Sequence, residues 1–282
     1  MTVLSRCQKY LTAGISACGG ALLMYYGINL KKNDERWIAH ASWTTNYTPS
    51  CQWDYNWDRR EPASLVKPSK RPEDDNRYNE ELEKLKPTAS RHIILIRHGQ
   101  YNLNGKTDKE RTLTNLGQEQ AKLTGQRLKD LGYEFSQIIV STMTRANETA
   151  GFIQKILPSE LPVTHCSLLV EGAPIPPEPP VGHWKPEAYQ FFQDGPRIEA
   201  AFRKYFHRAD VTQKADSYDL VVCHANVIRY FVCRALQFPC EAWLRLSLYH
   251  ASITWLTIMP SGRVKLVTYS DSGHMPLHAI SS

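Results

Sequence analysis

The sequence predicts an α/β protein, a three-layer α/β/α sandwich with a mainly parallel central sheet, preceded by an N-terminal transmembrane helix and an extended linker. Three observations lead to this expectation. Residues 91–282 alternate short apolar runs with amphipathic segments, as in a sheet covered by helices on both faces. Residues 10–30 carry no charge and are long enough to cross a bilayer as a helix. Residues 34–90 are dense in charge and lack long apolar periodicity.

The composition suits a globular protein and argues against several classes of partner. Of the 282 residues, 42% are hydrophobic and 22% are charged, which is enough apolar material for a full core. The formal net charge is +6, but Lys and Arg are scattered among Asp and Glu, so we expect no nucleic-acid partner. The seven cysteines form no C-x-x-C pair, and no pair of histidines flanks a glutamate at metal-ligand spacing. We therefore expect no disulfide framework, no metal and no cofactor.

The uncharged run is expected to be a membrane anchor or targeting segment that covers residues 1–33. Two basic residues flank it on each side, and small residues within it allow close helix contacts in lipid. A cleaved secretory signal would have a shorter apolar stretch, and a buried helix of a soluble protein is rarely so long and terminal. No acidic residue precedes Asp34, which also suits mitochondrial targeting. The balanced flanking charges leave the membrane orientation open.

The linker, residues 34–90, contains an unusual aromatic motif. Four of the seven tryptophans fall in this part of the chain, although a flexible tether should be poor in aromatic residues. Two of them, Trp53 and Trp57, belong to the sequence WDYNWD at residues 53–58. We expect this motif to dock into a groove on this chain or on a neighbouring copy, because Trp is favoured as an interface anchor. The alternative is a local cap on the domain that follows.

Residues 91–282 are expected to form that domain. Buried strands are predicted at residues 92–96, 138–140 and 220–223. Thr114 is expected to cap a helix that ends at Gly132. Two further helices are indicated by apolar stripes at helical spacing, one in residues 146–157 and one in residues 198–206. A hairpin of residues 252–259 and 263–269 completes the sheet.

Four groups of polar residues follow the predicted apolar runs. Arg97 and His98 come directly after the first strand, Arg145 begins the helix after the second, and His224 follows the third. Glu171 stands where another short apolar run breaks into a Pro-rich loop. Each residue alone is more often structural or solvated. Because open α/β sheets bind ligands at the carboxyl ends of their strands, we expect the four groups to meet. Together they supply a nucleophile, cations and a proton donor, as metal-free phosphoryl transfer requires.

The same motifs resemble the histidine phosphatase (phosphoglycerate mutase) superfamily in number, order and spacing. They are Arg97-His98-Gly99, Leu113-Thr114-x-x-Gly117, S-x-x-x-R-A-x-x-T from Ser141 to Thr149, and His224. The stretches WDYNWDRREP, GAPI, HWKPEA, RIEAAF, CHANVIRY, RALQFP and LRLSL resemble mitochondrial protein Ser/Thr phosphatases of that superfamily. The resemblance covers about residues 53–276 and the placement of an N-terminal anchor.

The resemblance implies a role for each site residue. His98 attacks phosphorus through a neutral ring nitrogen, giving a phosphohistidine. Arg97, Arg145 and His224 bind the phosphate, with His224 cationic once phosphate is bound. Glu171 is the acid that protonates the departing oxygen and then the base toward water. The sequence departs from the family pattern after Gly99, where Gln and Tyr stand in place of Glu and a hydroxyl residue. Asn104 is expected to be a further phosphate contact, although the neighbouring hydroxyl is missing.

The resemblance also implies a setting for the enzyme. It implies phosphorylated Ser/Thr proteins as substrates, a mitochondrial membrane crossed by a single pass (outer or inner), and self-assembly into homo-oligomers. Assembly would use Trp53, Asp54, Asn56, Trp57 and Asp58, and would raise activity. The short segment between Glu171 and His224 disfavours a mutase, whose insertion there is longer. Two alternatives stay open: a small-molecule phosphatase, and a membrane-bound scaffold with vestigial catalytic residues.

Overall fold

The computed structural model describes residues 49, 51–66, 75–182 and 184–282. Contacts divide the chain into two units, Met1–Gln52 and Trp53–Ser282. The predicted anchor, residues 1–33, lies outside the described residues, and within the described part no helix is long and apolar enough to span a membrane. The second unit begins at Trp53, well before the boundary expected at Arg91. The WDYNWD motif therefore belongs to the same compact unit as the candidate site.

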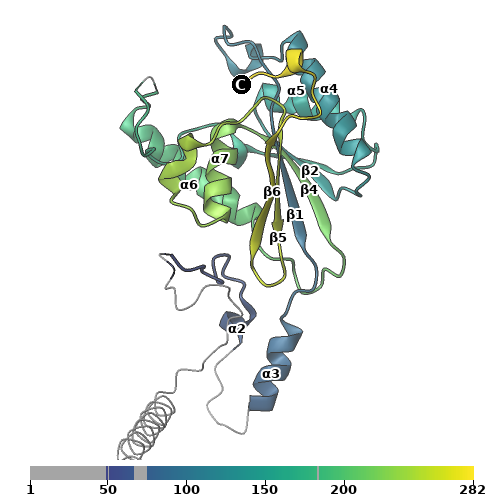
Figure 1. Ribbon diagram of the computed structural model, residues 1–282, viewed down its shortest axis with the longest axis vertical. Helices are drawn as coiled ribbons and strands as arrows, with labels where there is room; N and C mark the ends of the chain where they lie inside the picture. The colour runs from purple at the N-terminus through teal and green to yellow at the C-terminus, as the bar shows by residue number, and fades with distance from the viewer. Residues whose placement is uncertain (1–48, 50, 67–74, 183) are drawn as a thin grey trace, which may run out of the picture. The chain divides into compact units, whose positions relative to one another are not determined.

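The second unit is built on a six-stranded sheet with the order β3-β2-β4-β1-β5-β6 (Figure 1). The strands are β1 (Arg91–Arg97), β2 (Gln137–Ser141), β3 (Val163–Cys166), β4 (Ser217–Cys223), β5 (Ile253–Ile258) and β6 (Val264–Asp271). Strands β1 to β4 run parallel to one another, whereas β5 is antiparallel to both β1 and β6. The prediction of a mainly parallel sheet is confirmed, and the two antiparallel pairings make the sheet a mixed one. Because β5 is antiparallel, its first residues lie at the edge where the parallel strands end.

Helices cover both faces of this sheet, which gives the three layers that the sequence predicts (Figure 1). They are α4 (Asn115–Asp130), α5 (Thr144–Gln154), α6 (Ala188–Tyr205) and α7 (Ala225–Ala235); α2 (Pro62–Leu65) and α3 (Asp75–Lys84) precede the sheet. The alternation of β1 explains the arrangement, since neighbouring side chains of a strand face opposite ways. Ile93 and Leu95 pack in the core with α6 and α7. Ile94 and Ile96 pack in the core with α4 and α5.

Local signals set the ends of several elements where the sequence predicts them. The hydroxyl of Thr114 accepts a hydrogen bond from the Gly117 N–H at 3.1 Å and caps α4. Gly132, just past that helix, has φ of +69°, a conformation that Gly adopts without strain. Gly262, in the turn between β5 and β6, has φ of +84° for the same reason.

One predicted element differs in the structure. The apolar run before Glu171 is a short 3-10 helix, Ser167–Leu169, and not a strand. The neighbouring strand is β3, which lies at the sheet edge with Thr164 and His165 exposed, so its sequence carries no apolar run. Arg197 of α6 donates to the carbonyl oxygens of Leu168, Val170 and Glu171, and these bonds hold the turn in place. Glu171 is therefore positioned by α6 and not by the end of a strand.

Candidate active site

Four of the predicted site residues gather at the edge where β1, β2 and β4 end. His98 directly follows β1, Arg145 lies in the first turn of α5, and His224 stands between β4 and α7. The ring centroids of His98 and His224 are 5.2 Å apart. Arg97, the last residue of β1, completes the group.

His98 is buried and held as a neutral imidazole. Its Nδ1 lies 2.8 Å from the carbonyl oxygen of Gly99, and the Nε of Arg145 donates to its Nε2 at 3.2 Å. A carbonyl can only accept, so the ring hydrogen is on Nδ1 and the lone pair is on Nε2. Burial lowers the pKa of His98 well below 6.5, and the neighbouring His224 and the charges of Arg145 and Arg97 lower it further. The unprotonated Nε2 is the nitrogen available as a nucleophile.

Arg145 is oriented on three sides. Besides its bond to His98, its guanidinium lies over the ring of Tyr101, 4.7 Å from the centroid. Its Nη1 lies 3.6 Å from Oδ1 of Asp108. The other carboxylate oxygen of Asp108 accepts from the backbone N–H and the hydroxyl of Thr144, both at 2.9 Å, at the start of α5. Asp108 thus fixes both the helix start and the arginine that it carries.

Arg97 is held from the opposite side of the site. Its guanidinium donates to the Leu248 carbonyl, and its Nη2 lies 3.1 Å from Nε2 of His250. Burial lowers the pKa of Arg97 to about 10, against the attraction of Glu171. The side chain therefore stays cationic at neutral pH.

His224 is fully buried, and its orientation depends on Ser141. The Nε2 of His224 lies 2.7 Å from the Ser141 hydroxyl, which also accepts weakly from the Met143 N–H at 3.5 Å. Among the described residues the Ser141 hydroxyl has no other acceptor, so it donates to Nε2 and the hydrogen of the neutral ring is on Nδ1. Burial lowers the pKa of His224 well below 6.5, and Arg145 and Arg197 add to this effect. His224 is therefore neutral in this structure, with Nδ1 as a hydrogen-bond donor.

Three buried nitrogen atoms in this group have no hydrogen-bond partner among the described residues. They are Nε of Arg97, Nη1 of Arg145 and Nδ1 of His224. A buried donor without a partner lowers the stability of the folded protein by about 1–3 kcal/mol. Three such donors on residues that lie near His98 fit an anion with several oxygen atoms, which arginines bind in a charge-assisted way.

Glu171 lies at the mouth of the site, in a cavity of about 520 Å³ that it lines together with Tyr101, Arg145 and Trp184. Its carboxylate accepts from the backbone N–H groups of Gly172 at 3.2 Å and Asn226 at 3.4 Å. Burial raises the pKa of Glu171, although these two hydrogen bonds and the nearby arginines oppose the shift. A carboxyl group with a raised pKa beside the reacting centre is suited to proton transfer.

Asn104 is the one predicted phosphate contact that the structure does not bring to this group. Its side chain is exposed, and its backbone N–H donates to Oδ1 of Asn102 at 3.1 Å. In the described part of the chain it has no side-chain hydrogen bond to the other candidates. Instead, Tyr101 reaches the nucleophile, with its ring edge-on to His98 at 5.1 Å. The residue that departs from the family pattern thus forms one wall of the site.

Sequence reasoning missed Tyr101, Asp108, Ser141 and His250 as parts of the site. His250 could have been found from topology, since it lies just before β5 and Ile253 of that strand pairs with Ile96 of β1. The antiparallel direction of β5 brings its start beside His98, with the ring centroids of His98 and His250 5.7 Å apart. Asp108 gives no such signal, because it begins a short 3-10 helix, Asp108–Glu110, that does not directly follow a strand.

The buried, neutral state of His98 predicts a pH-dependent stability. The pKa of His98 is lowered in the folded protein, so below pH 6.5 the unfolded chain binds a proton that the folded chain does not. Stability should therefore fall as the pH falls. In His98→Gln this loss of stability at low pH disappears. Below pH 6.5 we therefore expect the unfolding free energy of the wild type to fall, relative to that of His98→Gln, by about 1.4 kcal/mol per pH unit. Urea unfolding at several pH values measures it; parallel curves for wild type and variant would contradict the assignment.

The WDYNWD motif packs against its own catalytic unit. Trp57 is 6% exposed, contacts Phe202 of α6 with ring centroids 5.9 Å apart, and donates from Nε1 to the Gly262 carbonyl at 2.8 Å. Asp58 forms a buried ion pair with Arg208 and accepts from its backbone N–H. These contacts are those of the local cap that the sequence leaves as an alternative.

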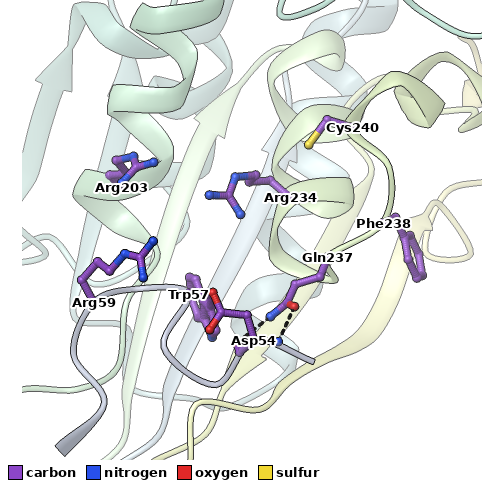
Figure 2. A pocket seen from close by; sticks show the side chains of 8 residues that line it. All are labelled: Asp54, Trp57, Arg59, Arg203, Arg234, Gln237, Phe238 and Cys240. Carbon is purple, nitrogen blue, oxygen red and sulfur yellow. Dashed lines mark hydrogen bonds between the residues drawn. The ribbon is translucent and has the colours of Figure 1, made fainter. Parts of the chain in front are cut away.

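The remaining motif residues make smaller contacts. Figure 2 shows Asp54 exchanging two hydrogen bonds with Gln237, from its backbone N–H at 2.8 Å and to its backbone carbonyl at 2.9 Å. Trp53 is partly buried against the core, and the Asn56 side chain accepts from the Glu61 N–H at 3.1 Å. In Figure 2 three arginines, Arg59, Arg203 and Arg234, surround the adjoining cavity of about 320 Å³.

Comparison with known proteins gives consistent matches. The model of the histidine phosphatase superfamily (branch 1) matches residues 93–173 and 181–272. The chain is 55% identical to the mitochondrial serine/threonine-protein phosphatase Pgam5 of Drosophila pseudoobscura pseudoobscura, over 98% of this chain and 96% of that protein. It is 54% identical to the Pgam5 protein of Drosophila willistoni, over 98% and 97%. The solved structure of mycobacterial hydrolase 1 shares the fold, with a TM-score of 0.50 and 22% identity over 65% of this chain and all of that one.

Proposed function

Because this chain belongs to the histidine phosphatase superfamily, we propose that it is a protein serine/threonine phosphatase that takes the phosphoryl group onto His98 without a metal ion. The observation that carries the proposal is the set of three buried donors, on Arg97, Arg145 and His224, that have no hydrogen-bond partner in the described part of the chain and belong to the same group as the neutral His98 ring. The names of the relatives supply the substrate class.

In the first half of the reaction, Nε2 of His98 attacks phosphorus as the ester P–O bond breaks. The Arg145 Nε–H that bonds to Nε2 must turn to a phosphate oxygen beforehand, which frees the lone pair. The three unpaired donors bind the charged oxygens, which is electrostatic stabilisation of the transferring group. The Gly99 carbonyl keeps its bond to Nδ1–H and stabilises the positive charge that the ring acquires. Glu171 gives its proton to the departing Ser or Thr oxygen.

In the second half, water replaces the departed hydroxyl. Glu171, now a carboxylate, takes a proton from the water as its oxygen attacks phosphorus and the N–P bond breaks. The products are inorganic phosphate and the neutral imidazole, so the site returns to its starting state. Nearby Arg145 and Arg97 stabilise Glu171 while it is ionised.

A direct assay tests the substrate class. The full-length chain in detergent is incubated with a phosphothreonine peptide in EDTA, and phosphate release is measured. Release that survives EDTA supports the proposal. Release only from small phosphate esters would favour a small-molecule phosphatase, and no release from either by the assembled protein would favour a scaffold.

We place the protein in a mitochondrial membrane, anchored by a single pass within residues 1–33. The uncharged run supports the anchor, and the names of the relatives support the mitochondrion. Alkaline extraction of isolated mitochondria should leave the full chain in the membrane pellet and release a chain that lacks residues 1–33. Extraction of the full chain into the supernatant would count against the anchor.

Self-assembly through the WDYNWD motif is part of the same proposal. Trp57 anchors the motif, so Trp57→Ala should reduce both the particle size and the turnover. The loss of a buried Trp should also lower the unfolding free energy by about 3–5 kcal/mol. Light scattering measures the size, with Tyr189→Ala, an aromatic on α6 that is 57% exposed, as the control. A lower Tm with unchanged particle size would mean that the motif is a cap only.

A further inference from the structure

Ser281 lies one side chain away from Arg97, the arginine proposed to bind phosphate. Ser281, the residue before last, accepts from the His250 N–H through its carbonyl at 2.8 Å. Its hydroxyl lies 3.0 Å from Nδ1 of the same histidine. On the other side of that ring, Nε2 meets Nη2 of Arg97 at 3.1 Å. The imidazole of His250 therefore links Ser281 to Arg97.

The donors and acceptors of the hydrogen bonds that link Arg97, His250 and Ser281 can be assigned. Arginine can only donate, so Nε2 of His250 is the acceptor and the ring hydrogen is on Nδ1. The Nδ1–H then donates to the Ser281 hydroxyl oxygen. Burial lowers the pKa of His250 to about 3, and Arg97 adds to the effect, so the ring stays neutral at working pH. The Ser281 oxygen fixes which nitrogen faces Arg97.

The same hydroxyl also supports the loop that follows the nucleophile. Gln120 of α4 is fully buried, and its Nε2 donates to the Ser281 hydroxyl and to the Ala279 carbonyl, both at 2.8 Å. Its Oε1 accepts from the backbone N–H of Gln100 at 2.8 Å. Gln100 is two residues after His98, so this route holds the backbone next to the nucleophile.

Apolar packing keeps the end of the chain in place. Ala279 and Met275 are buried in a small cluster with Ala251, and Leu116 and Leu123 of α4 pack against it. The hydroxyl of Ser281 is therefore delivered to His250 and Gln120 by a segment that is itself ordered by α4. Ser282, one residue further, is exposed and makes no side-chain hydrogen bond in this part of the structure.

We propose that Ser281 is a positioning residue, which orients Arg97 through His250 and the loop after His98 through Gln120. It touches no reacting atom. Its effect is on phosphate affinity, because a displaced Arg97 donates poorly to the phosphoryl oxygens in the ground state and in the transition state alike. The inference rests on the proposed phosphatase function.

The test compares Ser281→Ala with Ser282→Ala and with Ser281→Thr in the full-length protein. In Ser281→Ala we expect the inhibition constant of inorganic phosphate to rise and kcat/KM for a phosphothreonine peptide to fall, each about tenfold, as for a buried partner left unpaired. Ser282→Ala should match the wild type, and Ser281→Thr, which keeps the hydroxyl, should recover most of the loss. An equal loss of phosphate affinity in Ser281→Thr, or none in Ser281→Ala, would overturn the proposal.

A second comparison separates orientation from simple packing. If Ser281 acts on Arg97 through His250, Ser281→Ala should weaken phosphate binding much less in a His250→Asn background than in the wild type. Additive losses would overturn this route. A wild-type protein that hydrolyses nothing would refute the proposed function, whereas an active wild type with an unaffected Ser281→Ala refutes only the positioning role.

Discussion

Replacement of His98 with asparagine is expected to remove nearly all turnover, with kcat lower by a factor of about 10⁴ or more. Asparagine retains a polar side chain but has no ring nitrogen that can form the N–P bond. The neutral Nε2 of His98 is the only side-chain nucleophile in the proposed mechanism, whereas the other site residues stabilise charge or transfer a proton. Initial rates with a phosphothreonine peptide measure the effect.

The control for this variant is His278→Asn, since His278 has a side chain that is 70% exposed. It should retain wild-type turnover. His98→Asn should still bind inorganic phosphate, because Arg97, Arg145 and His224 remain. A variant that loses phosphate binding and thermal stability together would report misfolding. A well-folded His98→Asn that keeps a substantial share of wild-type turnover would contradict the assignment of the nucleophile.

The second large effect is expected at Glu171, where glutamine cannot supply a proton. For a phosphothreonine peptide, Glu171→Gln should lower kcat/KM by about 10²–10⁴, the usual contribution of a general acid. The leaving alkoxide needs that proton, whereas the stable phenolate of 4-nitrophenyl phosphate does not. The first half-reaction with the nitrophenyl ester should therefore be much less affected, which a pre-steady-state burst of nitrophenolate measures.

The comparison of leaving groups distinguishes acid catalysis from positioning. Glu171 accepts backbone hydrogen bonds from Gly172 and Asn226, so glutamine will also disturb the cavity wall to some degree. That disturbance would slow both substrates equally. Equal losses with the peptide and the nitrophenyl ester would mean that Glu171 shapes the cavity and transfers no proton. Glu160→Gln, which changes an exposed carboxylate, is the matched control.

The core strands could be predicted from the sequence because burial on both faces leaves a continuous apolar run. Strands β1, β2 and β4 have such runs, and their ends correctly indicate where Arg97, His98 and His224 lie. The edge strand β3 could not be found in this way, since two of its four residues are exposed. The apolar run before Glu171 is a 3-10 helix that follows β3, so an apolar run alone does not indicate a strand there.

The parts of the site that depend on distant partners could not be predicted from local sequence patterns alone. Trp57 bonds to Gly262, 205 residues away in sequence, and no local pattern indicates that pairing. His250 reaches Arg97 only because β5 pairs antiparallel with β1, whereas the sequence predicted the β5–β6 hairpin without its place in the sheet. From the sequence, Tyr101 is only a residue that replaces the hydroxyl residue of the family pattern. In the structure its ring lies against the guanidinium of Arg145 and supports it.

The most direct test of the mechanism is to trap the phosphoenzyme. The full-length protein is mixed with a radiolabelled phosphothreonine peptide, quenched in alkali within the first turnover, digested and analysed by mass spectrometry. We expect label on Nε2 of His98, stable in alkali, lost in acid, formed and consumed at least as fast as turnover, and absent from His98→Asn. Turnover that proceeds with label on another residue, or with no phosphoenzyme at all, would contradict nucleophilic catalysis by His98.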